Sequence, residues 1–197
     1  MILLTGLGNP GEKFKNNRHN IGFMIADQIA KHYFSQPFRS KFFGDFSEGK
    51  VNDDRVLLLK PATFMNNSGQ SVMAVMNYFR LSSEQVIVFH DELDLESGKI
   101  RLKRGGGHGG HNGLRSVHAH IGEGYKRVRL GIGHPGIKNE VSNYVLQDFA
   151  KEEQKWLSVL ISSISSELRL LLTGNEPEFM NRISLAVEPF RSSRLKL

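Results

Sequence analysis

The sequence predicts a single-domain α/β protein with a twisted, mixed, mainly parallel sheet and helices on both faces. Short apolar runs at 56–59 and 86–89 have the length of buried strands, and they alternate with amphipathic segments of helical period. This alternation is typical of a largely parallel sheet covered by helices. The 197 residues are 39% hydrophobic, which suffices for one core, and no Pro/Ser linker divides them.

The expected elements begin with a buried strand from Leu3 that breaks at the glycines and proline of 6–11. A helix follows over 20–34, with Asn20 as its N-cap, and residues 41–60 form a hairpin that adds an antiparallel edge to the sheet. The remaining expected elements are a helix through 72–79, strands at 86–89 and 99–104, a helix through 114–121, a strand at 128–133, and helices at 138–149, 151–173 and 176–184. We treat residues 1–197 as one domain with a basic tail at about 186–197.

The composition narrows the class of protein. The absence of cysteine excludes a disulfide scaffold and thiol chemistry, and it fits a reducing compartment. Every apolar run is far shorter than the roughly 18 residues that span a bilayer, and the N-terminus lacks a charged signal-peptide leader. We therefore expect a cytoplasmic protein without a membrane partner. The net charge of +6 indicates a phosphate-bearing partner only if the cations cluster beside a site.

Gly6, Gly8 and Gly11 match the spacing of the dinucleotide-binding fingerprint. That fingerprint needs a helix that opens at once, so that its free N–H groups bind pyrophosphate, and an acidic residue about 20 positions later. Here a polar segment follows the glycines, and no acidic residue stands at that distance. We reject the nucleotide interpretation and expect the turn to present Asn9 and His19 to one cleft.

Polar side chains follow three predicted strands. Ligands of open parallel sheets bind at the carboxyl ends of the strands, so these side chains are candidate site residues. Asn9 follows the first strand, Asn66 lies beyond the strand at 56–59, and Asp91 follows the strand at 86–89. The glycine-rich loop adds His111 and Asn112 to the same edge. Each could be an ordinary loop residue, but their convergence predicts a site.

The most informative pair is His19 with Asp91. A carboxylate bonded to one imidazole nitrogen fixes the tautomer and stabilises the imidazolium, which makes the other nitrogen a general base. The sequence has no Gly-x-Ser-x-Gly motif and no cysteine, so this base would activate water. Asn9 could hydrogen-bond a substrate carbonyl or its oxyanion. The competing interpretation of His19 is a histidine near a helix N-terminus that bonds only to the backbone.

A metal site is the alternative chemistry, because His108 and His111 lie near His90 and Asp91. A His-x-x-His pair in a glycine loop lacks the helical frame that places such ligands on one face. We therefore expect no metal and no cofactor.

Cations cluster around the glycine run at 105–110, whose backbone N–H groups could approach an anion. Arg101 and Lys103 share one face of the strand that precedes it. The cluster is completed by Arg104, Arg115, Lys126, Arg127 and Arg129. It could bind nucleic-acid phosphates, or it could be a solvated face. Phe14 and Phe64 are candidate stacking platforms or pocket walls, with core packing as the alternative.

Six ordered blocks closely resemble the bacterial peptidyl-tRNA hydrolase family. They are GLGNPG (6–11), RHN (18–20), PATFMN (61–66), HDELD (90–94), GGGHGGHNG (105–113) and GIGHPG (131–136). The resemblance implies hydrolysis of the ester that joins a peptide, or another N-blocked aminoacyl group, to tRNA, which recycles the tRNA. It also implies a metal-independent enzyme that is a monomer.

The resemblance assigns roles to residues of this chain. His19 would activate water, and Asp91 would orient the His19 imidazole. Asn9 would help to distinguish blocked from free aminoacyl groups. The implied binding residues are Phe14, Phe64, Asn66 and Asn112 for the peptide and the tRNA 3′ end, and Arg101, Lys103 and Arg129 for phosphates.

One position departs from the family, which usually has tyrosine where this chain has Phe14. The ring is retained but the hydroxyl is lost, so a hydrogen bond from this position is not expected here. The alternative function is that of a non-hydrolytic RNA-binding relative of the same fold.

Overall fold

The computed structural model describes residues 1–191 and contains one seven-stranded sheet of order β2-β3-β4-β1-β5-β7-β6. The strands are β1 (Ile2–Gly6), β2 (Arg39–Lys41), β3 (Gly44–Val51), β4 (Asp54–Pro61), β5 (Val86–Glu92), β6 (Ile100–Arg104) and β7 (Lys126–Gly131). The four central strands, β4, β1, β5 and β7, are parallel to one another. The predicted hairpin forms an antiparallel edge, and β6 adds a second antiparallel edge that the sequence analysis did not predict.

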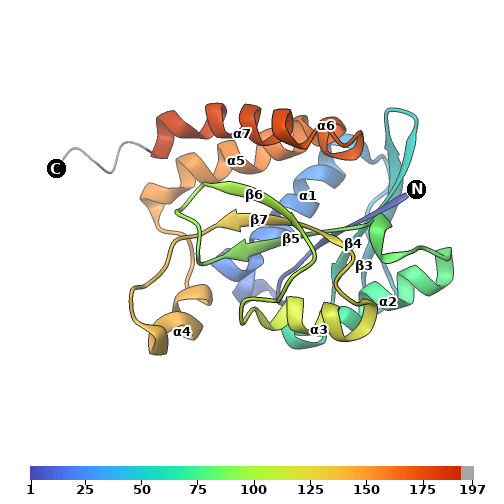
Figure 1. Ribbon diagram of the computed structural model, residues 1–197, viewed down its shortest axis with the longest axis horizontal. Helices are drawn as coiled ribbons and strands as arrows, with labels where there is room; N and C mark the ends of the chain where they lie inside the picture. The colour runs from blue at the N-terminus through green and yellow to red at the C-terminus, as the bar shows by residue number, and fades with distance from the viewer. Residues whose placement is uncertain (192–197) are drawn as a thin grey trace.

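Helices cover both faces of the sheet (Figure 1). They are α1 (Ile21–Tyr33), α2 (Ser68–Phe79), α3 (Asn112–Ile121), α4 (Val141–Val145), α5 (Gln154–Ser166), α6 (Leu168–Leu172) and α7 (Glu176–Arg191). One core lies between the sheet and α1, α5 and α7, and a second lies between the sheet and α2 and α3. Because strand side chains alternate between faces, Leu4 enters the first core and Leu3 the second. The predicted fold class is confirmed.

The C-terminal helices differ from the prediction. The expected helix at 151–173 is divided at Glu167 into α5 and α6, although its apolar face stays buried from Trp156 to Leu171. Four serines between 162 and 166 explain the break, because serine hydroxyls compete with helical backbone bonds. The expected helix at 138–149 shortens to α4 after a 3-10 turn.

The last helix is longer than predicted. α7 continues past 184 to Arg191, which donates a hydrogen bond to the Ser97 carbonyl oxygen and pairs with Glu96. These contacts with the loop before β6 extend the helix, so the first part of the predicted tail is helical. Residues 192–197 of that tail lie outside the described residues. Within residues 1–191, no helix combines the length and apolarity needed to cross a membrane.

The first turn places the entry of α1 against the ends of β1 and β5. A Cβ atom at Gly6 would lie 2.1 Å from the Gly22 carbonyl oxygen, and a Cβ at Gly22 would lie 2.4 Å from the Phe89 carbonyl oxygen. Larger residues at either position would push the helix away from the sheet. These glycines therefore permit close helix–sheet packing, which brings His19 beside the end of β5.

Candidate active site

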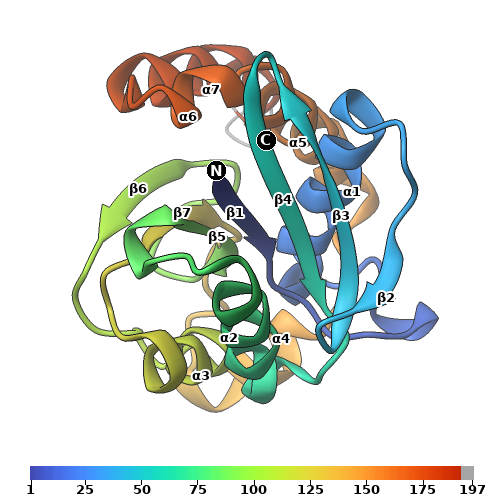
Figure 2. The same cartoon turned by 90° about the vertical axis from the view of Figure 1, so that its right-hand side faces the viewer.

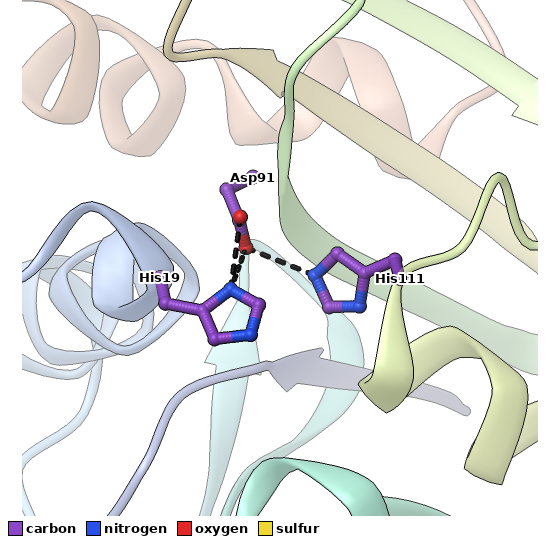
Figure 3. Close-up of side chains that lie close together, drawn as sticks. All are labelled: His19, Asp91 and His111. Carbon is purple, nitrogen blue, oxygen red and sulfur yellow. Dashed lines mark hydrogen bonds and ion pairs between the residues drawn. The ribbon is translucent and has the colours of Figure 1, made fainter. Parts of the chain in front are cut away.

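His19 and Asp91 meet at the carboxyl edge of the parallel strands (Figure 3). His19 lies in a 3-10 turn over Arg18–Asn20, and Asp91 is the penultimate residue of β5, which ends at Glu92. The Nδ1 atom of His19 is 2.9 Å from both carboxylate oxygens of Asp91. The side chains are 11% and 2% exposed, so the pair is nearly dry but the imidazole retains access to solvent.

His111 binds the same carboxylate, a contact that the sequence analysis missed. Its Nε2 atom lies 2.9 Å from Asp91 Oδ1, and its Nδ1 accepts hydrogen bonds from the N–H groups of Gly113 and Leu114 at the start of α3. Because Nδ1 is an acceptor, Nε2 carries the proton and donates to Asp91. The sequence placed His111 at the same sheet edge as Asp91 and directly before a predicted helix, where a side-chain acceptor can cap, but neither signal predicted the contact between the two side chains.

The electrostatics distinguish the histidines around this carboxylate. Burial lowers the pKa of His19, but the charge and hydrogen bond of Asp91 outweigh burial and raise that pKa above its ordinary value. Burial raises the pKa of Asp91, yet His19 and His111 together hold it well below its usual range. Burial, followed by His111, lowers the pKa of His90 to about 3, and its Nδ1 is bonded to the Asp91 backbone oxygen. His19 is therefore the histidine suited to accept a proton near neutral pH.

Asn9 is held rigidly beside this pair. Its Oδ1 accepts a hydrogen bond of 2.9 Å from the Met65 N–H, so the amide orientation is fixed and Nδ2 is the group left to donate to a substrate. The side chain of Asn20 pairs with the Asn9 backbone instead of capping α1, although Asn20 occupies the predicted N-cap position. The predicted N-cap position of Asn20 is confirmed, although its side chain makes no capping hydrogen bond.

A cavity of about 350 Å³ opens at these groups. It is lined by Asn9, His19, Phe64, Met65, Asn66, Asn112, Arg115, Ser142, Val145 and Leu146. Besides His19, four of the predicted catalytic and binding residues line this one cavity: Asn9, Phe64, Asn66 and Asn112. The Phe64 side chain in its wall is 61% exposed. Phe14 does not line this cavity; it is half-buried, with the Lys13 ammonium 4.7 Å from its ring centroid.

The predicted cation cluster separates into different roles. Arg101 and Lys103 are exposed on β6, whereas Arg129 is bonded to Glu92 at 2.8 Å and Lys126 to Glu176 at 2.5 Å. Arg127 is buried, and its guanidinium donates to the backbone carbonyls of three loop glycines, Gly105, Gly106 and Gly107. Arg127 therefore shapes the glycine-rich loop and is not an exposed phosphate ligand.

The proposed metal ligands do not assemble as the alternative required. His90 is buried against the backbone, and His108 accepts a hydrogen bond from the Gly110 N–H. Ligand atoms of His19, Asp91 and His111 do lie within 4.8 Å of one another. Hydrogen bonds of 2.9 Å join the imidazole nitrogens of His19 and His111 to the Asp91 carboxylate, and these bonds account for the grouping of the three side chains.

The site combines an α/β sheet with a buried histidine–aspartate pair and an amide donor at the carboxyl edge of its parallel strands, an arrangement that can activate water for hydrolysis. The chain belongs to the peptidyl-tRNA hydrolase family, since the family model described as peptidyl-tRNA hydrolase matches residues 3–191. The resemblance found in the sequence is thereby confirmed.

Relatives and solved structures agree with this family. A peptidyl-tRNA hydrolase of Dinoroseobacter shibae is 58% identical over 193 residues, covering 98% of this chain and 82% of that protein. The corresponding protein of Paracoccus denitrificans is 55% identical with the same two coverages. A crystal structure of peptidyl-tRNA hydrolase from Acinetobacter baumannii is 43% identical, covers 93% of this chain and 94% of that chain, and superposes with a TM-score of 0.87.

Proposed function

We propose that His19 activates the water molecule that cleaves the ester between peptide and tRNA. This enzyme hydrolyses peptidyl-tRNA, the reaction of the family to which the chain belongs. The observation that supports the role of His19 is its contact with Asp91, which holds Nδ1–H and leaves Nε2 as the acceptor. The carboxylate stabilises the imidazolium that forms when Nε2 takes a proton from water.

The hydroxide formed in this step adds to the ester carbonyl carbon and gives a tetrahedral oxyanion. Asn9 Nδ2 is the donor placed to stabilise that oxyanion, since Oδ1 is bonded to the Met65 N–H. Collapse of the intermediate breaks the bond to the ribose oxygen, which takes the proton from His19. The products are the peptide with a carboxyl group and the tRNA with a free 3′-terminal hydroxyl.

The binding roles are part of the same proposal. Phe64, Asn66 and Asn112 hold the aminoacyl residue and the tRNA 3′ end, because they line the cavity that contains His19. Arg101 and Lys103 bind tRNA phosphates through exposed side chains, with Arg129 as a weaker contact because Glu92 already neutralises it. Phe14, which the family resemblance also assigned to binding, lies outside the cavity lining. The protein acts as a cytoplasmic monomer.

The non-hydrolytic RNA-binding alternative is not favoured. Curated relatives that are 55–58% identical over nearly the whole chain are named peptidyl-tRNA hydrolase. This chain also retains the His19–Asp91 contact, which simple RNA binding does not require.

The decisive experiment measures release of free tRNA from N-acetyl-aminoacyl-tRNA, run beside the unblocked aminoacyl form. We expect cleavage of the blocked substrate and little cleavage of the unblocked one. His19→Ala should lower the rate by about 10²–10⁴-fold, the value of a general base, while tRNA binding persists. His32→Ala, at the opposite end of α1, is the matched control and should behave as wild type. Undiminished turnover by His19→Ala would overturn the mechanism.

A further inference from the structure

A second cavity, of about 400 Å³, shares the lining residue Asn9 with the catalytic cavity. Asn9 lines both cavities, so the two spaces meet at the residue that is placed beside the reacting ester. Apolar side chains contribute much of the wall of the second cavity, namely Pro10, Phe23, Met24, Pro61 and Ala62. Its volume falls within the range of about 300–1,000 Å³ that is typical of ligand pockets.

We propose that this second cavity binds the peptide residues that precede the ester-linked residue of the substrate. The proposal rests on the proposed function and adds a subsite to it. The substrate has two parts, a polyanionic tRNA and a peptide, which diverge from the ester. Each part therefore needs its own path away from His19. The two cavities have different charged lining residues, and these charges determine whether a cavity favours the tRNA or the peptide.

The charges assign the second cavity to the peptide. Three carboxylates, those of Glu12, Asp27 and Asp45, line it, against the two ammonium groups of Lys15 and Lys60. Lys60 Nζ lies 2.6 Å from Asp27 and 3.7 Å from Asp45, and Lys15 is paired with Glu12. The cations are therefore already neutralised and one carboxylate is in excess, which disfavours a phosphate. No acidic side chain within residues 1–191 lines the catalytic cavity, and Arg115 does.

The sheet order separates the two paths in space. The exposed cations Arg101 and Lys103 lie on β6, at one end of the sheet, whereas Asp45 and Lys60 lie on β3 and β4 toward the other end. Figure 2 shows β1 and β5 between these two ends of the sheet, and Asp91 lies on β5. A substrate whose tRNA crosses β6 and β7 must therefore extend its peptide toward β3 and β4.

A strained turn next to β3 is bonded to Ala62, one of the residues that line this cavity. Phe42 and Phe43 form the turn between β2 and β3, and their φ angles of 58° and 55° are unusual for bulky residues. Turns of this kind favour Asn-Gly. Phe42 compensates for its strain by packing on Phe46, Tyr78 and Phe79, but Phe43 is 59% exposed.

The backbone of Phe43 is bonded to a residue of the cavity wall. The Phe43 carbonyl oxygen accepts a hydrogen bond of 2.8 Å from the N–H of Ala62, which lines the cavity, and the next residue, Gly44, pairs with Pro61. Strained and exposed residues are retained where function needs them. We include the exposed ring of Phe43 in the proposed subsite, as an apolar platform for peptide side chains beside Ala62.

The test compares N-acetylated substrates that carry one, two or three residues on the same tRNA, with the same residue at the ester. For the wild type, kcat/KM should rise on the order of tenfold with the added apolar residues, the factor expected when an apolar side chain leaves water. The quantity compared is the ratio of kcat/KM for the longer substrates to kcat/KM for the one-residue substrate. Ala62→Trp, which fills the cavity, and Phe43→Asn, which removes the ring, should reduce this ratio toward one. Leu185→Trp, on an exposed position of α7, is the matched control and should keep the wild-type ratio.

A stability measurement separates folding from binding. Asn tolerates a positive φ better than Phe, so Phe43→Asn should have an equal or higher melting temperature while it loses the preference for longer peptides. Equal ratios in the wild type and both variants would overturn the subsite, as would a uniform loss on all three substrates. If the wild type cleaves none of the blocked substrates, the proposed function itself fails.

Discussion

The side chain of Asn20 pairs with the backbone of Asn9 through two hydrogen bonds of 2.9 Å, one in each direction. This pairing joins the turn after β1 to the segment that carries His19. Both residues are buried, so neither backbone group of Asn9 can exchange its partner for bulk water.

Asn20→Ala should therefore destabilise the protein by about 1–3 kcal/mol, because it leaves buried backbone groups without partners. Denaturant unfolding measures this change, and kcat/KM should fall in parallel as Asn9 loses its fixed position. Asn139→Ala, on an exposed 3-10 turn, should change neither quantity. An Asn20→Ala variant of wild-type stability would show that the pairing contributes little.

Asp91→Asn should shift the pH dependence as well as lower the rate. His19 must be neutral to accept a proton. The Asp91 carboxylate holds the pKa of His19 above its ordinary value, against the effect of burial. Without that charge burial dominates, the pKa falls, and the acidic limb of kcat/KM should move to lower pH. The maximal rate should drop by about 10²–10⁴-fold. Asp94→Asn, an exposed neighbour, is the control, and an unmoved limb in Asp91→Asn would exclude His19 as the titrating base.

His111→Asn should move the acidic limb of kcat/KM to higher pH, opposite to the shift expected for Asp91→Asn. Asparagine can still cap α3 but is too short to bond Asp91 as His111 does. The carboxylate, freed from one donor, should interact more strongly with His19 and raise its pKa further. We expect kcat to fall on the order of tenfold, consistent with a hydrogen bond to a charged group. A pH–rate profile measures both effects, with His108→Asn as the control in the same loop; a shift toward acid would contradict the network.

Lys103→Gln should weaken tRNA binding and reduce the slope of log K against log salt by about one unit, as expected for a phosphate contact. Arg129→Gln should change the slope less, because Glu92 already neutralises Arg129. Filter binding of tRNA over a range of salt concentrations measures the slopes. Lys31→Gln, at the far end of α1 from His19, should leave the slope unchanged. Equal slopes for Lys103→Gln and the wild type would remove Lys103 from the tRNA surface.

Local patterns were sufficient for much of the fold. Four-residue apolar runs located β4 and β5, and the recurrence of Ile21, Ile25 and Ile29 located α1, since burial on one face leaves a period in the sequence. The rule that parallel strands end at a common edge also placed Asp91 near Asn9 and His19. The helix at 151–173 shows the limit: its apolar period continues through Glu167, where the backbone leaves the helix.

By itself, the sequence determined the α/β class, the family blocks and the pairing of His19 with Asp91, because each depends on residue type and strand order. Only the tertiary structure decided that His111 shares Asp91, that Asn20 pairs with Asn9, that Arg127 holds the glycine-rich loop and that Glu92 pairs with Arg129. These bonds depend on side-chain directions between segments far apart in the chain. No local periodicity records such directions, because they are fixed only when the helices and strands have packed.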